Sequence, residues 1–368
     1  MLSEIDTPAL IIDIETAEKN IRTMREFIAS KKTKLRAHTK IHKSPFLAHM
    51  QIAGGSSGIT CAKVGEAEVM VQGGISDILI ANEIVGRRKT ERLANLARFC
   101  DLKVAVDDLD NAKDISKAAG ESGSEVGVLV DVNLSSGGSF GDKNLRGMLN
   151  RCGVPPGNAA VDLAVAISKL PNLRLKGVMG YEGGLPDYPT REQSDSVARD
   201  SIELLVKTKE AIEDRGIDAK TVSCGSSTSY KVAASVPGVT ELQAGSYILM
   251  DTYHHRFSPE FDYALWVEAQ VISLPNPRRA IVDAGGTAIS GDAGLPELRV
   301  ARPDLKVIEL NAEHVHLEME AGLLRRGDRV QLVPSNIDTT TCLHDNYIVT
   351  RKGEVEMLLP VAARGKFQ

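Results

Sequence analysis

Cationic and imidazole side chains crowd the run Arg36-Ala-His-Thr-Lys-Ile-His-Lys43, which begins inside the β-like stretch 34–38. A lysine at the inner end of a buried strand is costly unless it is paired or used covalently. Lys40 lies closest to the end of the strand, whereas Lys43 is expected in the first turn of the next helix. Spacing favours Lys40 as the reactive amine, and Lys43 remains the alternative lysine. A solvated basic loop is the alternative to both.

Two stretches rich in glycine and serine, Cys224-Gly-Ser-Ser-Thr228 and Gln243-Ala-Gly-Ser-Tyr247, each follow a short β-like run. Small residues let backbone N–H groups approach an anion, and hydroxyl groups add donors. Ordinary turns explain either stretch alone, but two of them at neighbouring strand ends favour a phosphate site. A reactive lysine and a phosphate site together suggest pyridoxal phosphate bound as a Schiff base. We expect the cationic neighbours Arg36 and His42 to favour the neutral amine.

Alternating strands and helices over 14–252 must position these groups. Short apolar runs at 34–38, 59–61, 78–81, 102–106, 126–131, 175–180, 221–224 and 240–243 alternate with helical patterns at 45–53, 64–72, 89–98, 109–119, 160–169, 191–215 and 229–234. Parallel neighbours require crossovers, so about eight such units predict a TIM-type (β/α)8 barrel of the α/β class. A doubly wound sheet is the alternative, but no GxGxxG motif follows the first strand.

Function in such a barrel lies where strands run into their following loops. Besides Lys40 and the two Gly/Ser stretches, the predicted strand ends carry these polar residues: Cys61, Lys63, Asn82, Glu83, Asp131, Asn133, Tyr181 and Glu182.

The remaining residues, 1–13 and 253–368, predict an antiparallel β-domain that includes the N-terminal strand. Its strands are expected near 267–273, 279–283, 305–310, 328–333, 346–350 and 355–359. Asn336 and Asp338 are alternate residues, which on a strand would face the same way and offer two oxygen ligands. Such ligands suit Mg, Mn or Ca, whereas an Asx-turn is the alternative.

Composition excludes several classes of protein. The formal net charge is −5 with dispersed basic residues, so nucleic acid is not expected as a partner. Five scattered cysteines without a CxxC motif argue against a disulfide framework or a structural zinc site, and favour a reducing cytoplasm. No signal peptide and no apolar run of roughly 18 residues is present, so a membrane partner is not expected either.

The chain resembles the D-threonine aldolase and D-serine dehydratase group of fold-type III pyridoxal-phosphate enzymes, whose barrel is alanine-racemase-like. The resemblance runs from Asp6-Thr-Pro to Ala363-Arg-Gly365. Its motifs are Asp6-Thr-Pro-Ala-Leu10, Arg36-Ala-His-Thr-Lys-Ile-His-Lys43, Ala81-Asn-Glu-Ile-Val-Gly86, Thr240-Glu-Leu-Gln-Ala-Gly-Ser-Tyr247, Val282-Asp-Ala-Gly285, Glu313-His314 and Leu343-His-Asp345.

This resemblance implies a lyase that cleaves a β-hydroxy-D-amino acid to glycine and an aldehyde. Lys40 would be the Schiff-base lysine. The cofactor and its phosphate would be surrounded by His38, Tyr181, Ser226, Ser227, Thr228, Gly245, Ser246 and Tyr247. Relatives usually form homodimers with the active site near the interface, and a metal that binds the substrate's β-oxygen assists them.

Three positions depart from the family pattern. The aldolase metal motif Pro-x-His-x-Asp reads Pro334-Ser-Asn-Ile-Asp338, so Asn336 replaces an imidazole while Asp338 favours the aldolase branch over dehydratases, which carry Cys there. The motif Val-Asp-x-Gly-x-x-Arg-x-Gly, aligned on 130–138, puts Ser136 where an arginine beside the cofactor's phenolic oxygen is expected. Asp187 aligns with a histidine near the substrate hydroxyl, and we expect Asp187 to act as the base, with Tyr181 also in a catalytic position.

These changes predict a shifted substrate or reaction. The alternatives are a β-hydroxy-D-amino acid dehydratase, an amino acid racemase, and a pyridoxal-phosphate-binding protein without turnover.

Overall fold

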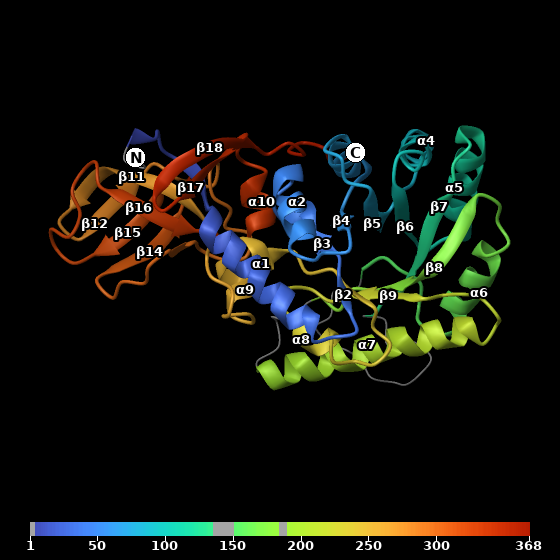
Figure 1. Cartoon of the computed structure of the whole chain (residues 1–368). Helices are drawn as coiled ribbons and strands as arrows, with labels where there is room; N and C mark the ends of the chain where they lie inside the picture. Colours follow the sequence, from blue (N-terminus) through green and yellow to red (C-terminus); the bar gives the residue numbers. More distant parts are fainter. Residues whose placement is uncertain (1–3, 135–150, 184–189) are drawn as a thin grey trace. The chain divides into compact units, whose positions relative to one another are not determined.

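The computed structural model describes residues 4–134, 151–183 and 190–368, and these form two compact units. The barrel unit contains Arg25–Lys40, Pro45–Gly245 and Lys366–Gln368. The β unit contains Met1–Met24, Ile41–Ser44 and Ser246–Gly365. Each unit is described separately below, with the element labels of Figure 1.

The barrel unit is built on a closed parallel sheet. Its strand order is β2-β10-β9-β8-β7-β6-β5-β4-β3, and β2 and β3 are two halves of one stretch interrupted at Arg36. This stretch pairs with β10 on one side and with β4 on the other, so eight strands close the ring. The predicted (β/α)8 barrel is confirmed. The strands are β2 (Lys34–Leu35), β3 (Ala37–His38), β4 (Ile59–Cys61), β5 (Asp77–Glu83), β6 (Asp101–Val106), β7 (Val126–Asp131), β8 (Leu173–Met179), β9 (Thr221–Cys224) and β10 (Glu241–Leu242).

Helices connect successive strands and lie outside the sheet, as Figure 1 shows for α4 to α7 around β5 to β9. Local signals set their ends. Asp108 caps α5 by accepting a hydrogen bond from Asn111 N, and Gly123 ends that helix with a left-handed φ of 65°. The helices are α2 (Pro45–Ala53), α3 (Val64–Gln72), α4 (Arg87–Leu96), α5 (Leu109–Ser122), α6 (Asn158–Ile167), α7 (Arg191–Glu213) and α8 (Tyr230–Ala233).

The barrel interior is a packed core. All six residues of β7 are buried, as expected for a strand covered on both faces. One buried cluster contains Leu79, Ala105, Leu129 and Met179, which come from four successive strands. The polar groups at the carboxyl ends of the strands therefore lie at the edge of a packed apolar core.

The β unit differs from the prediction in one respect, because its sheet is mixed. β1 pairs antiparallel with β11 but parallel with β17. The N-terminal strand joins the sheet as predicted, and its Ala9 and Ile11 pack with Trp266 and Val333. The strands are β1 (Ala9–Asp13), β11 (Leu265–Asn276), β12 (Arg279–Val282), β13 (Glu297–Leu298), β14 (Leu305–Leu310), β15 (Val315–Met319), β16 (Arg329–Val333), β17 (Asn346–Arg351) and β18 (Glu354–Pro360). The short helices are α9 (Thr252–His255) and α10 (Ile337–Thr341), and the longer α1 spans Ile14–Ala29.

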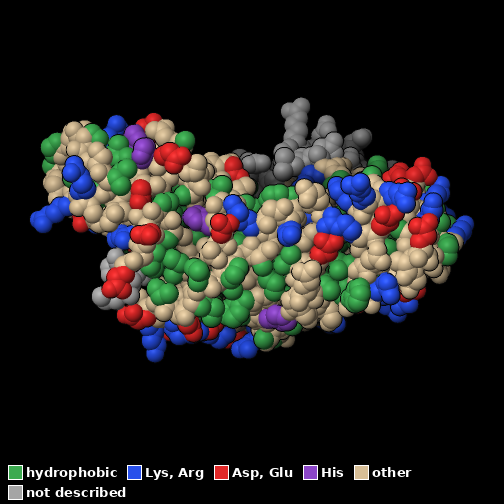
Figure 2. Space-filling model, turned by 90° about the horizontal axis from the view of Figure 1, so that it is seen from above, with side chains coloured by type: hydrophobic (Ala, Val, Ile, Leu, Met, Phe, Trp, Pro, Cys, Tyr) green, Lys and Arg blue, Asp and Glu red, His purple; other side chains and the backbone are tan. Residues whose placement is uncertain are grey.

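The surface agrees with the dispersed charge of the sequence. On the face in Figure 2, acidic and basic side chains are intermixed, without an extended area of one sign. None of the helices in the described residues is long and apolar enough to cross a membrane.

Candidate functional site

Lys40 lies at the carboxyl end of the first barrel strand. The strand continues from β3 into a 3-10 turn, η2 (Thr39–Ile41). His38 N donates to Ala244 O at 3.1 Å, and Thr39 Oγ1 donates to Thr60 O at 3.0 Å. Both bonds tie the residues before Lys40 to neighbouring strands, so its Cα has a fixed position at the strand end. Lys43 belongs instead to a segment of the β unit and has a left-handed φ of 52°.

Arg36 does not provide the free positive charge that the sequence led us to expect near the lysine. Its Nη1 lies 2.6 Å from Asp77 Oδ1, and its Nε lies 2.7 Å from Glu241 Oε2. Burial opposes ionisation of Asp77, but its hydrogen bonds and charge interactions with Arg36 and Lys103 hold the pKa of this carboxyl below its ordinary value. Two carboxylates thus compensate the guanidinium, and Arg36 acts as a structural ion pair inside the barrel unit.

The loop after β9 gathers hydroxyl groups in one turn. Ser226 Oγ and Thr228 Oγ1 are 2.8 Å apart, and Thr228 N donates to Ser226 Oγ at 3.3 Å. Ser227 and Thr228 are 1% and 7% exposed, so the loop is packed into the barrel end. Gly225 has a φ of +82°, which a side chain would strain. This compact set of hydroxyl donors has the chemistry of an oxyanion site.

Glu182 accepts two hydrogen bonds from the residues of this loop, a role that the sequence did not indicate. It is fully buried, and its Oε2 accepts a hydrogen bond from Gly225 N at 3.2 Å. Its Oε1 accepts a second hydrogen bond from Ser229 Oγ. Burial raises the pKa of Glu182, while these hydrogen bonds act in the opposite direction. The only signal in the sequence was an acidic residue at a strand end, directly after Tyr181.

Arg151 faces Tyr181 in the barrel unit, with its guanidinium carbon 4.9 Å from the ring centroid. Val154 N donates to Asp131 O at 3.0 Å and Asn133 N to Val154 O at 2.9 Å, so the chain returns to the end of β7 at this point. Arg151-Cys-Gly153 thus places the Arg-x-Gly pattern of the family motif next to the end of β7. In the sequence, 135–150 separate these residues from Val130-Asp131, so no local pattern connected them. Ser136 and Asp187 lie outside the described residues.

Two carboxylates and one thiol meet at the same barrel end. The ligand atoms of Glu83, Asp131 and Cys152 all lie within 4.8 Å of one another. Burial, and then Glu83, raise the pKa of Asp131 well above its ordinary value. Burial, and then the two acidic neighbours, raise the pKa of Cys152 to about 12. The strand-end list had named Glu83 and Asp131, but no pattern connected them to Cys152.

Ser246 and Tyr247 begin the last segment of the β unit, directly after Gly245, in the 3-10 turn η4 (Ser246–Ile248). Ser246 Oγ lies 3.3 Å from His254 Nε2, and His254 Nδ1 lies 2.7 Å from Asp251 Oδ1. Asp251 is fully buried and also caps α9. The imidazole therefore holds the serine hydroxyl in place, and only the fold reveals this Asp–His–Ser chain.

Asn336 and Asp338 do not alternate on a strand, and the structure shows the alternative interpretation, an Asx-turn. Asn336 caps α10, and its Oδ1 accepts a hydrogen bond from Asp338 N at 2.9 Å. One of the two lone pairs of this oxygen therefore already serves the helix cap. Among the described residues, Asp338 belongs to no group of three or more His, Cys, Asp or Glu ligands. This donor set does not fit a divalent cation on its own.

Comparisons with known proteins extend over the whole chain. Residues 12–252 match the family "Alanine racemase, N-terminal domain", and residues 264–350 match "Putative serine dehydratase domain". The 3-hydroxy-D-aspartate aldolase of Paracoccus denitrificans (strain Pd 1222) is 36% identical, over 99% of this chain and 93% of the relative. The crystal structure of D-threonine aldolase from Filomicrobium marinum has a TM-score of 0.92 at 36% identity, covering 99% of this chain and 97% of that one.

The chain belongs to the D-threonine aldolase and D-serine dehydratase family. The D-threo-3-hydroxyaspartate dehydratase of Delftia sp. (strain HT23) is a more distant relative, 31% identical over 80% of this chain and 75% of its own length. The family assignment confirms the resemblance that the motifs predicted, with its alanine-racemase-like barrel.

Proposed function

We propose that this protein is a pyridoxal-phosphate-dependent lyase that cleaves a β-hydroxy-D-amino acid to glycine and an aldehyde. The full-length similarity to two kinds of aldolase is the observation that carries this proposal. Asp338 supports it as well, because the family's aldolases have Asp where its dehydratases have Cys.

The residues of the barrel unit fit the cofactor. Lys40 offers an amine at a strand end, and the loop of Ser226, Ser227 and Thr228 offers hydroxyl donors for a phosphate. His38, Gly245, Ser246 and Tyr247 are the further residues proposed to contact it. Pyridoxal phosphate, when bound, supplies the electron sink that carbon–carbon cleavage requires.

Around the reacting end, we assign Arg151 to the position beside the cofactor's phenolic oxygen. Its guanidinium is permanently charged, and the contact with the Tyr181 ring restrains it. Asp187 remains the proposed base for the substrate's β-hydroxyl proton, and Tyr181 is proposed to border the substrate. Glu182 and His254 are proposed as positioning residues, because Glu182 accepts hydrogen bonds from Gly225 N and Ser229 Oγ, and His254 lies against Ser246 Oγ.

We assign no reaction step to a divalent cation. The family relationship suggests Mn, Mg or Ca at Asn336 and Asp338, but the capping bond of Asn336 argues against these two residues as a sufficient site. Dialysis against a chelator, followed by assay with and without each cation, tests the point. Unchanged activity after removal of the cation would support the interpretation that Asn336 and Asp338 do not form a sufficient cation site.

The deciding experiment incubates the enzyme with a panel of β-hydroxy-D- and L-amino acids and assays glycine, aldehyde and keto-acid separately. Glycine with aldehyde supports the aldolase. A keto-acid selects the dehydratase, a change of optical rotation alone selects the racemase, and the absence of all products with bound cofactor selects a non-catalytic carrier.

We also propose a cytoplasmic homodimer with the active site near the subunit interface, which rests on the family alone. Light scattering on purified protein tests the dimer.

A further inference from the structure

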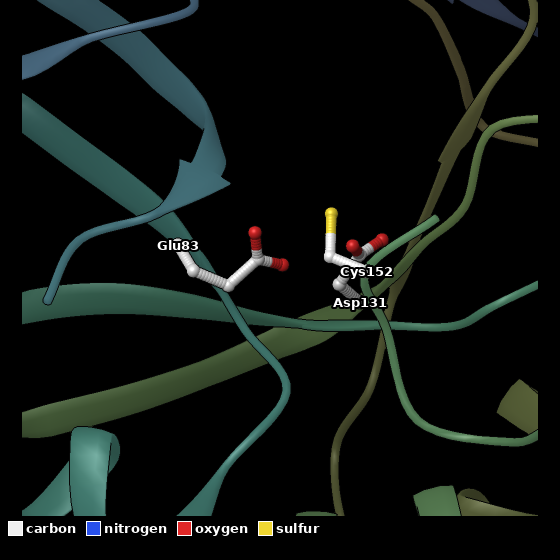
Figure 3. Close-up of side chains that lie close together, drawn as sticks. All are labelled: Glu83, Asp131 and Cys152. Carbon is white, nitrogen blue, oxygen red and sulfur yellow. The ribbon is translucent and has the colours of Figure 1, made fainter. Parts of the chain in front are cut away.

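The cluster of Glu83, Asp131 and Cys152 has no role in the proposed lyase reaction. Figure 3 shows the Glu83 carboxylate turned toward the thiol and toward Asp131, and the potential ligand atoms all lie within 4.8 Å of one another. These groups come from two strand ends and from the segment that returns to β7, so they are far apart in sequence.

Both carboxyl groups of this cluster have acidic neighbours. Asp131 is only 6% exposed, and after burial the group that raises its pKa most is Glu83. Glu83 Oε1 is buried and has no hydrogen-bond partner among the described residues. Buried carboxylates are normally paired with donors or cations. Because the cluster contains only acidic groups, it offers no positive charge to either carboxylate.

The backbone fixes all three residues in place. The register of β5 against β6 shifts between Ile80 and Glu83, and such bulges redirect side chains at strand ends. Cys152 is anchored on both sides, since Arg151 O accepts from Asn133 Nδ2 at 2.7 Å and Gly153 N donates to Asp107 Oδ2 at 3.0 Å. A side chain at Gly153 would lie 2.6 Å from Asn133 N, so only glycine permits this approach.

We propose that Glu83, Asp131 and Cys152 bind a divalent cation of the zinc type. One thiolate with two carboxylates suits Zn²⁺, whereas Mg²⁺ and Ca²⁺ prefer oxygen ligands alone. Cys152 is exposed, which leaves a fourth position open to water or a small ligand. As the ion binds, the thiol proton and any proton shared by the carboxyls pass to solvent. The site is separate in sequence from Asn336 and Asp338, and the proposal does not depend on the lyase activity.

The test uses the full-length protein loaded with pyridoxal phosphate, dialysed against a chelator and then titrated with Zn²⁺. X-ray absorption at the zinc edge is expected to show one sulfur neighbour at about 2.3 Å. Cys152→Ser should remove this sulfur signal. Cys100→Ser, which changes a thiol elsewhere on the barrel unit, and Asp338→Asn, which changes the family's cation position, should both keep it.

A second variant guards against a folding defect in Cys152→Ser. Glu83→Gln retains the thiol and should weaken Zn²⁺ binding by about tenfold or more in competition with a coloured chelator, since even partners outside the ligand shell cost about that much. Zinc bound only by nitrogen and oxygen ligands in the wild type overturns the proposal. So does wild-type affinity in both Cys152→Ser and Glu83→Gln, in which case the two carboxyls simply share a proton.

Discussion

Replacement of Glu182 tests how the phosphate loop is held. In Glu182→Ala, Gly225 N and Ser229 Oγ lose their acceptor inside a fully buried site. Each unsatisfied buried group costs about 1–3 kcal/mol, so we expect the free energy of unfolding to fall by about 2–6 kcal/mol. Glu182→Gln keeps the volume and one carbonyl acceptor, and it should cost about 1 kcal/mol near neutral pH.

The dependence on pH separates these two variants further. Burial raises the pKa of Glu182, so the folded state holds its proton more tightly than the unfolded chain. The contribution of this residue is therefore fully present below its unfolded pKa of about 4.3, and it is lost as pH rises through the folded value. Glu182→Gln cannot ionise, so its stability relative to the wild type should increase as pH rises through this window.

Urea unfolding from about pH 4 to about pH 8 measures both effects. Glu210→Gln, an exposed carboxyl on α7, is the matched control and should change stability by no more than about 0.5 kcal/mol. The dissociation constant of pyridoxal phosphate should rise in Glu182→Ala and change little in Glu182→Gln. Equal losses of stability in Glu182→Ala and Glu182→Gln would refute the hydrogen-bond argument. A difference between wild type and Glu182→Gln that does not vary with pH would refute the protonation argument.

Three further predictions concern other groups. Lys40→Ala should abolish the visible absorption band of the bound cofactor while Lys43→Ala preserves it, and the reverse pattern would show that the wrong lysine was chosen. Arg151→Met should lower kcat by about 100-fold or more while the cofactor still binds, because a fixed charge near the reacting atoms is lost. An unchanged kcat would show that another residue lies beside the phenolic oxygen. Arg36→Met should destabilise the barrel by about 3–5 kcal/mol in thermal or urea unfolding, because Asp77 and Glu241 lose their partner; a loss below about 1 kcal/mol would contradict the buried ion pair.

Local sequence patterns determined most of the architecture. Apolar runs alternating with amphipathic stretches predicted eight barrel strands and seven helices within a few residues of their observed bounds. The same patterns placed Lys40 and the Ser226–Thr228 loop at strand ends. This worked because hydrophobic periodicity and crossover geometry are local properties, and parallel barrels bring all carboxyl ends of their strands to one side.

Tertiary structure decided which partner each polar group meets. Arg36 pairs with Asp77 and Glu241, which are 41 and 205 positions further along the chain. No local sequence pattern predicts partners at such distances. The bridge between Val132 and Val154 brings Arg151 near the end of β7, which supports the proposal that Arg151, and not Ser136, takes the position of the family arginine. Asn336 caps a helix in an Asx-turn, which the sequence had left open against two ligands alternating on a strand.

The sequence therefore determined the scaffold and the position of Lys40 at a strand end, since both depend on short-range periodicity and on residue type. The Glu182 support, the Asp251–His254–Ser246 chain and the Glu83–Asp131–Cys152 cluster came only from the fold. The residues of each group are far apart in the sequence, and packing of the core brings them together. The free energy for this comes from burial of the whole core and not from any local preference of the chain.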